Sequence, residues 1–182
     1  MKHRRSSVKA LGALAAVLTL IVSAFKWVLI GRYRQRVEPL WAPFVRHSEL
    51  ITGLYESAAV PTLLGMLTGT PFMSPLLRLF GAKIGRRVCL DTTYTTEFDL
   101  VRVGDDACIG RACSLQTHLF EDRVMKMSTV EVGAGCAVGP RTVILYDTTV
   151  GAGAKLDGLS LVMKGESIPA GTNWRGIPAR LA

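Results

Sequence analysis

The sequence predicts a mainly β protein whose C-terminal part, residues 84–182, winds into a left-handed parallel β-helix of hexapeptide repeats. Three observations predict this fold class. An aliphatic residue recurs every six positions, glycine or a small or acidic residue often follows it, and a small side chain usually stands four residues after it. A helix would need apolar residues about 3.6 positions apart, and an antiparallel strand would need apolar and polar residues to alternate over longer stretches. Neither structure explains a period of six.

The first element, residues 1–36, is predicted to be a transmembrane helix with basic flanks. Its apolar run, residues 10–30, carries no charge before Lys26, whose amine is expected to reach the headgroup level. About 20 apolar residues are enough to cross a bilayer. A cleaved signal peptide is the alternative, because residues 22–24 (Val-Ser-Ala) resemble a cleavage site. The apolar run continues beyond them and favours an uncleaved anchor.

The basic excess of the chain lies in the same segment. The formal net charge is +8, and residues 37–182 are balanced, so the whole excess precedes the first acidic residue, Glu38. Basic clusters on both sides of an apolar run suit anionic lipid headgroups better than a nucleic acid. We therefore expect a membrane partner and no nucleic-acid partner.

Residues 37–83 are expected to form a helical, membrane-proximal bridging region. The pattern predicts a helix over 49–67 that is interrupted near Pro61, and a second helix over 75–80 that ends at Gly81. The apolar side chains of this region form a surface that must be covered. The membrane, a partner subunit and the flank of the β-helix all remain open as its cover.

The repeat itself runs from Ile84 to Trp174. From residue 132 onward the aliphatic positions keep the period of six without a slip, and three hexads are expected to make one turn of a narrow triangular coil. Glycine after the aliphatic residue fits a tight corner where a Cβ would crowd the next coil. Cys113 and Cys136 fall at the small inward positions and are interpreted as inert core thiols.

One insertion, residues 116–131, breaks the repeat and is expected to project as a loop from a corner of the coil. Projecting loops on a rigid scaffold often carry function. This loop holds His118, the only histidine of the β-helical part. An imidazole that titrates near pH 6.5 can accept a proton from an amine or hydroxyl at neutral pH. His118 is therefore the candidate general base, and a loop histidine with structural hydrogen bonds is the alternative. Glu121 or Asp122 is a candidate to orient it, and solvation or pairing with Arg123 is their alternative.

Residues 103–180 resemble the hexapeptide-repeat O- and N-acetyltransferases. Thr117-His118 matches the pair that opens the inserted loop in that family, and residues 176–180, Gly-Ile-Pro-Ala-Arg, match its closing Gly-x-Pro-Ala-basic motif. The resemblance implies a pantetheine thioester donor, either acetyl-CoA or carrier-protein phosphopantetheine. It places Gly176, Pro178 and Arg180 beside that donor. Trp174 either stacks on a ligand or caps the open end of the coil.

A closer resemblance begins near Lys26 and covers nearly all of the chain after it. The chain is similar to the C-terminal membrane-linked, acetyltransferase-like domain of ε-poly-lysine synthetase-type nonribosomal peptide synthetases. The runs that carry this likeness are 27–41, 52–57, 91–93, 97–101, 115–126 and 174–180. Within them Asp91, Glu97 and Asp99 are candidates to bind a cationic aminoacyl group, and corner hydrogen bonds are their alternative role.

These observations predict a membrane-tethered acyltransferase that moves an acyl or aminoacyl group from a thioester to an amine or hydroxyl. The resemblance implies a homotrimer or pseudo-trimer and an adenylation or carrier protein as partner. We expect the bacterial cytoplasmic membrane, with the β-helix in the cytoplasm; the nearly equal positive charge of the two flanks does not itself set the orientation. We expect no metal, because the zinc enzymes of this fold need three histidine ligands. The alternatives are a non-catalytic docking domain of a synthetase and a sugar or antibiotic O-acetyltransferase.

Overall fold

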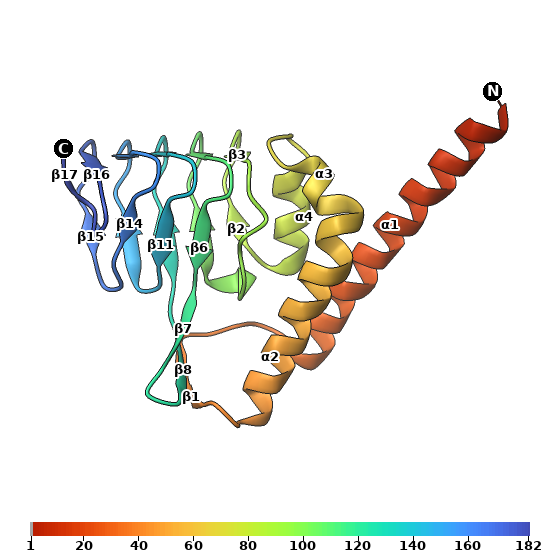
Figure 1. The fold of residues 1–182 in the computed structure, drawn as a ribbon, viewed down its shortest axis with the longest axis horizontal. Helices are drawn as coiled ribbons and strands as arrows, with labels where there is room; N and C mark the ends of the chain where they lie inside the picture. The colour runs from red at the N-terminus through yellow and green to blue at the C-terminus, as the bar shows by residue number, and fades with distance from the viewer. Residues whose placement is uncertain (1) are drawn as a thin grey trace.

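A computed structural model describes residues 2–182, with side-chain surroundings described from residue 10 onward. Helix α1 (Lys2–Leu29) projects obliquely from the molecule, and a layer of shorter helices lies between it and the first coil of the β-helix (Figure 1). The coils then stack away from this layer, so that the C-terminus lies at the far end from α1. The predicted fold class, a left-handed parallel β-helix with an apolar N-terminal helix, is confirmed.

Three parallel sheets form the faces of the β-helix. The first contains, in spatial order, β15 (Ser167–Ile168), β12 (Thr148–Val150), β9 (Val130–Val132), β4 (Val101–Val103) and β2 (Lys83–Ile84). The second contains β14 (Leu161–Val162), β11 (Val143–Leu145) and β6 (Ser114–Gln116). The third contains β17 (Arg180–Leu181), β16 (Asn173–Arg175), β13 (Lys155–Leu156), β10 (Ala137–Val138), β5 (Cys108–Ile109) and β3 (Cys89–Leu90), with β17 antiparallel to β16.

The period of six places equivalent aliphatic residues on top of one another. Strand register pairs them coil by coil into three inward stacks, one for each face. The first stack is Ile84, Val103, Val132, Val150 and Ile168, the second Leu90, Ile109, Val138, Leu156 and Trp174, and the third Leu115, Ile144 and Val162. Apart from the half-buried Trp174, all of these residues are buried in one continuous core.

Glycine at the corners is required by the spacing of the coils. A Cβ on Gly104 would lie 2.5 Å from the backbone nitrogen of Ala134, and one on Gly133 would lie 2.7 Å from that of Ala152. Real Cβ atoms do not approach backbone atoms so closely. The corner glycines therefore set how tightly successive coils can stack.

The bridging region contains two helices that pack on the β-helix. The first runs without a break through α2 (Pro43–Leu54), the π-helical η1 (Tyr55–Leu64) and α3 (Gly65–Leu67), so it starts earlier than predicted. Pro61 lies inside the π-helical part instead of interrupting the helix; the wider turn accommodates its missing N–H. The second, α4 (Met73–Phe80), ends at Gly81 with φ +113°.

An aromatic cluster joins these helices to the coil. The rings of Tyr55 and Phe80 both contact Phe98, which belongs to the short 3-10 helix η2 (Phe98–Leu100), at centroid distances of 5.0 and 4.8 Å. Tyr55, Phe80 and Leu77 are buried in the same core as the repeat. The flank of the β-helix therefore covers much of the apolar surface of the bridging region.

Helix α1 is docked along one face. Ala15, Thr19, Val22 and Ser23 are buried, whereas most large apolar side chains of the helix are exposed. By length and composition, Ala10–Leu29 and Pro43–Leu67 could each cross a membrane. Lys26 does not reach outward to headgroups as predicted. Its side chain is fully buried and its amine contacts Asp99.

The inserted segment is a β-hairpin rather than an irregular loop. Strands β7 (His118–Glu121) and β8 (Val124–Met127) pair antiparallel around Asp122 and Arg123, both at positive φ as hairpin turns of this length require. Strand β1 (Arg36–Pro39), directly after α1, adds to the open edge of β8. Figure 1 shows this three-stranded sheet hanging below the coil, beside the start of α2.

Candidate active site

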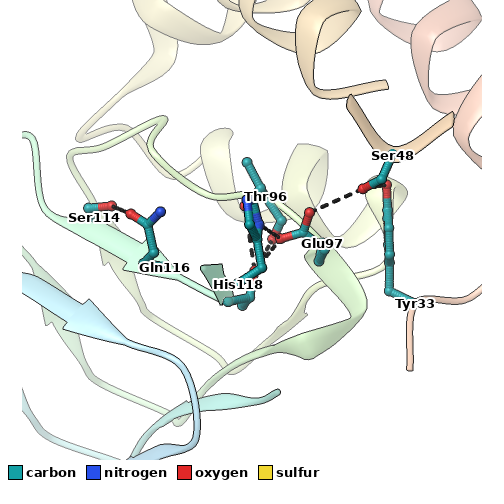
Figure 2. Close-up of polar contacts among 8 residues, drawn as sticks. Tyr33, Ser48, Thr96, Glu97, Ser114, Gln116 and His118 are labelled. Carbon is teal, nitrogen blue, oxygen red and sulfur yellow. Dashed lines mark hydrogen bonds and ion pairs between the residues drawn. The ribbon is translucent and has the colours of Figure 1, made fainter. Parts of the chain in front are cut away.

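His118 and Glu97 form a buried pair at the base of the hairpin. Nδ1 of His118 lies 2.7 Å from Oε2 of Glu97, and both side chains point into the space between the coil and α2 (Figure 2). The Glu97 side chain is fully buried, whereas that of His118 is 10% exposed. The imidazole therefore has one nitrogen held by a carboxylate and a small part of its ring open to solvent.

The Glu97 carboxylate is held by three side chains. The backbone of Glu97 lies in the left-handed region with φ +37°, immediately before η2. Besides His118, its carboxylate accepts hydrogen bonds from Thr117 Oγ1 at 2.6 Å and from Ser48 Oγ of α2 at 3.2 Å. Ser48 also contacts the hydroxyl of Tyr33 at 3.3 Å, and burial raises the pKa of Tyr33. A carboxylate with this many donors has little freedom to rotate.

His118 and Glu97 each stabilise the charged form of the other. Burial alone would lower the pKa of His118, but the hydrogen bond and charge of Glu97, with the charge of Glu49, raise it above its usual value. Burial would raise the pKa of Glu97, but the hydrogen bond and charge of His118, with hydroxyl donors beside it, lower it. In its neutral form His118 donates Nδ1–H to Glu97 and keeps the lone pair on Nε2. That arrangement is the one a general base needs.

A pocket of about 350 Å³ opens beside His118. The coil and the hairpin supply part of its wall, including Tyr94, Gln116 and Phe120, and the long helix supplies Glu49 and Glu56. Neither of these two glutamates makes an ion pair with another side chain within the described part of the chain. The wall facing the coil is therefore acidic and free to meet a cation.

Glu121 does not orient His118, contrary to the prediction. Both residues lie on β7, three positions apart, so their side chains leave the strand on opposite faces. The Glu121 carboxylate instead accepts from Lys164 Nζ at 2.5 Å and from Lys126 Nζ at 3.2 Å. The structure gives the orienting contact to Glu97.

The three acidic residues expected to share a cationic ligand do not form one site. Asp91 follows β3 and pairs with Arg111 at 3.3 Å, whereas Asp99 pairs with Lys26 at 2.5 Å. Glu97 is bound to His118 and inaccessible. The period of six slips by one residue between Leu90 and Val103, the stretch that holds these three residues, and their side chains enter different surroundings. The carboxylates that face the pocket are Glu49 and Glu56, which the prediction did not include.

The closing motif lies in the last coil, away from His118 within this chain. Trp174 stacks below Leu156, and its Nε1 donates to Thr172 at 2.9 Å, in keeping with a capping role. The backbone N–H of Gly176 donates to Ser160 Oγ at 3.2 Å, and Arg180 lies 3.8 Å from Glu166. Gly176, Pro178 and Arg180 are exposed. Among the residues that the structure describes, no group of three or more His, Cys, Asp or Glu side chains is arranged to hold a metal ion.

Comparison with known proteins identifies relatives of this chain. No protein-family model matches the chain. The chain is 51% identical over 160 residues to Delta-poly-L-ornithine synthetase of Acinetobacter baumannii, and 35% identical over 109 residues to UDP-3-O-acylglucosamine N-acyltransferase of a Caulobacter species. The chain is therefore similar to a poly-amino-acid synthetase and to an N-acyltransferase.

The chain spans only a small part of the length of these curated relatives. The matches cover 88% of this chain and 12% of the synthetase, and 55% of this chain and 30% of the N-acyltransferase. Among solved structures it is similar to a hexapeptide-repeat-containing acetyltransferase of Vibrio cholerae, with a TM-score of 0.53, 18% identity, and coverage of 68% of this chain and 86% of that one. The same enzyme complexed with acetyl coenzyme A matches with a TM-score of 0.51 and 18% identity, covering 65% of this chain and 81% of that one. These likenesses concern the fold.

Proposed function

We propose that this chain is a hexapeptide-repeat acyltransferase that moves an acyl or aminoacyl group from a pantetheine thioester to an amine, with His118 as general base. The observation that carries the proposal is the His118–Glu97 pair, 2.7 Å apart, opening on an acidic pocket. A base held by a buried carboxylate beside a cavity is the arrangement that acyl transfer to a weak nucleophile requires.

The chemistry needs one proton acceptor that later becomes a donor. The nitrogen of the acceptor amine attacks the thioester carbonyl and forms the C–N bond, while Nε2 of His118 takes a proton from that nitrogen. The tetrahedral intermediate then collapses, the C–S bond breaks, and the imidazolium returns the proton to the leaving thiolate. Glu97 stabilises the imidazolium between these steps, and such a base contributes about 10²–10⁴-fold in rate.

The acceptor is a cationic amine. Glu49 and Glu56 line the pocket opposite the coil, seven residues apart on one helix, and neither forms an ion pair with a side chain that the structure describes. They suit a substrate that carries a second, protonated amine while the first one reacts. The name of the relative, Delta-poly-L-ornithine synthetase, agrees with such a substrate.

The donor is a pantetheine thioester, carried by coenzyme A or by a carrier protein. The structural neighbour with bound acetyl coenzyme A supports this class of donor. We assign its binding to Gly176, Pro178 and Arg180, as the family resemblance implies. Because these residues lie away from His118 in this chain, a neighbouring copy or a similar domain supplies them to each site, in a homotrimer or pseudo-trimer.

Helix α1 tethers the enzyme to the bacterial cytoplasmic membrane, with the β-helix in the cytoplasm beside an adenylation or carrier protein. The span Ala10–Leu29 has a mean hydropathy of 2.0, and basic residues stand on both sides of it. Cations at both ends of an apolar helix bind anionic headgroups.

The test is thioester consumption by the full chain in lipid nanodiscs. Acetyl-CoA and the ornithyl thioester of pantetheine serve as donors and L-ornithine as acceptor, with thiol release and the amide product measured together. We expect product from the wild type and a loss of about 10²–10⁴-fold in His118→Ala. Equal rates in the two proteins would contradict the role of His118 and favour a non-catalytic docking domain. Acetylation of a sugar hydroxyl in preference to the amine would favour an O-acetyltransferase.

A further inference from the structure

Helix α1 contacts the body of the molecule through a buried ion pair. Lys26 Nζ lies 2.5 Å from Asp99 Oδ2, and the lysine side chain is fully buried. The backbone N–H of Tyr33, just beyond α1, donates to the same oxygen at 3.1 Å. The indole of Trp27 lies 3.5 Å from the ammonium. A lysine at this depth is stable only with such a partner.

The end of α4 closes over this ion pair. A Cβ on Gly81 would lie 2.6 Å from Asp99 Oδ1 and 3.0 Å from Lys26 Nζ, so only a glycine leaves room there. Ser23 and Trp27 of α1 both donate hydrogen bonds to the carbonyl of Leu79, at 3.2 and 2.9 Å. The contact is thus specific in both charge and shape.

The partner of Lys26 is separated by only one residue from the carboxylate that holds His118. Glu97 and Asp99 flank Phe98, whose ring is fixed in the aromatic cluster, and the N–H of Leu100 donates to the Glu97 carbonyl at 2.8 Å. One short turn, residues 97–100, therefore carries both contacts. On one side of this turn Asp99 contacts Lys26 of α1, and on the other side Glu97 contacts His118.

We propose that Lys26 and Ser48 are positioning residues of the acyl-transfer site. Lys26 of α1 holds the 97–100 turn through Asp99, and Ser48 of α2 holds Glu97 directly, so that Glu97 reaches His118. The inference rests on the proposed role of His118. If it holds, the docking of α1 is needed for activity. A substitution that undocks this helix lowers activity without changing a residue of the pocket.

Two variants test this in the full chain in nanodiscs. Lys26→Met removes the cation, and Lys26→Met with Asp99→Asn removes both charges, so that no lone buried charge opposes folding. The pKa of His118 is read by NMR titration of labelled histidine, and its signal is identified by its loss in His118→Gln. Glu97, Glu49, Glu56 and Tyr94 are the other titratable groups near this imidazole.

Positioning and simple electrostatics predict different changes in the pKa of His118 for each variant. Removing a nearby cation would by itself raise the pKa of His118, and removing both charges would leave it almost unchanged. Loss of positioning instead lowers it in both variants, toward 6.5, because Glu97 no longer holds the imidazole. In the acyl-transfer assay we expect kcat to fall about tenfold or more with the acceptor KM unchanged, part of what a general base contributes.

The matched control is Lys164→Met, which breaks another 2.5 Å ion pair, with Glu121 on the hairpin, but leaves Glu97 untouched. Its His118 pKa should equal that of the wild type. A His118 pKa that stays or rises in both Lys26 variants, in protein with wild-type circular dichroism, would overturn the proposal. The titration gives this answer even if the wild type transfers no acyl group, so failure of the proposed function is recognised separately.

Discussion

At the scale of single residues, the site depends on a histidine whose two nitrogens have different surroundings. Nδ1 is bound to a buried carboxylate, and the ring borders a pocket with two glutamates that form no ion pair among the described residues. Sequence proximity suggested Glu121 as the partner of His118, but alternation along β7 sends that side chain to the other face. Glu97, one coil earlier, is the partner because the coils stack.

The pocket glutamates should determine which acceptor is used. We expect Glu49→Gln with Glu56→Gln to raise the KM for L-ornithine about tenfold and to leave the KM for an uncharged amine within about twofold, because one exposed charge pair contributes about 0.2–1 kcal/mol. Steady-state kinetics with the two acceptors measures the difference. An equal rise in KM for both acceptors would show that the glutamates shape the pocket rather than attract a cation.

Glu121 should be dispensable for catalysis. Glu121→Gln weakens surface ion pairs with Lys126 and Lys164 but leaves the His118–Glu97 contact in place. The expected kcat lies within about twofold of the wild type, since exposed ion pairs contribute little. A decrease in kcat as large as that of His118→Ala would show that Glu121 takes part in catalysis.

At the scale of elements, the corner glycines and the inward stacks together fix the coil. Gly133→Ala would bring a Cβ against the backbone of the next coil, and we expect a loss of about 1–3 kcal/mol in the free energy of unfolding. Gly53→Ala is the control, because a Cβ there meets nothing within 4 Å and alanine favours a helix by about 0.5–1 kcal/mol. Denaturation followed by circular dichroism should show opposite signs; two losses of equal size would refute the role given to the corner.

The elements also explain what the sequence could and could not reveal. The period of six predicted the stacks from Ile84 to Trp174 because each inward position repeats at the same place on every coil. The slip between Leu90 and Val103 hides which residues of adjacent coils meet, so the sequence predicts ligand binding or corner hydrogen bonds for Glu97 but not its contact with His118. Glu49 belongs to a helix whose cover the sequence left open, and only its packing against the coil brings it to the pocket.

At the scale of the whole molecule, the chain holds His118 in its middle and the motif to which we assign donor binding in its last coil. Under this proposal a second copy or a similar domain is needed to complete each site. We expect the full chain in detergent to have the mass of three protomers, and dilution to monomers to abolish acyl transfer while leaving the circular dichroism unchanged. Mass photometry together with the thiol-release assay tests this; a fully active monomer would contradict the shared site.

The most direct test of the central claim is the pH dependence of kcat/KM in the wild type and in Glu97→Gln, with one acceptor used for both. The rate needs unprotonated His118, so it should rise as the pH passes the pKa of that residue, which Glu97 holds above 6.5. Without the carboxylate charge, the midpoint of that rise should move to lower pH and the plateau should fall by about tenfold or more. The ionisation of the acceptor is common to both proteins and cancels in the comparison. Identical midpoints and plateaus in the two proteins would contradict the claim that the His118–Glu97 pair performs the acyl transfer.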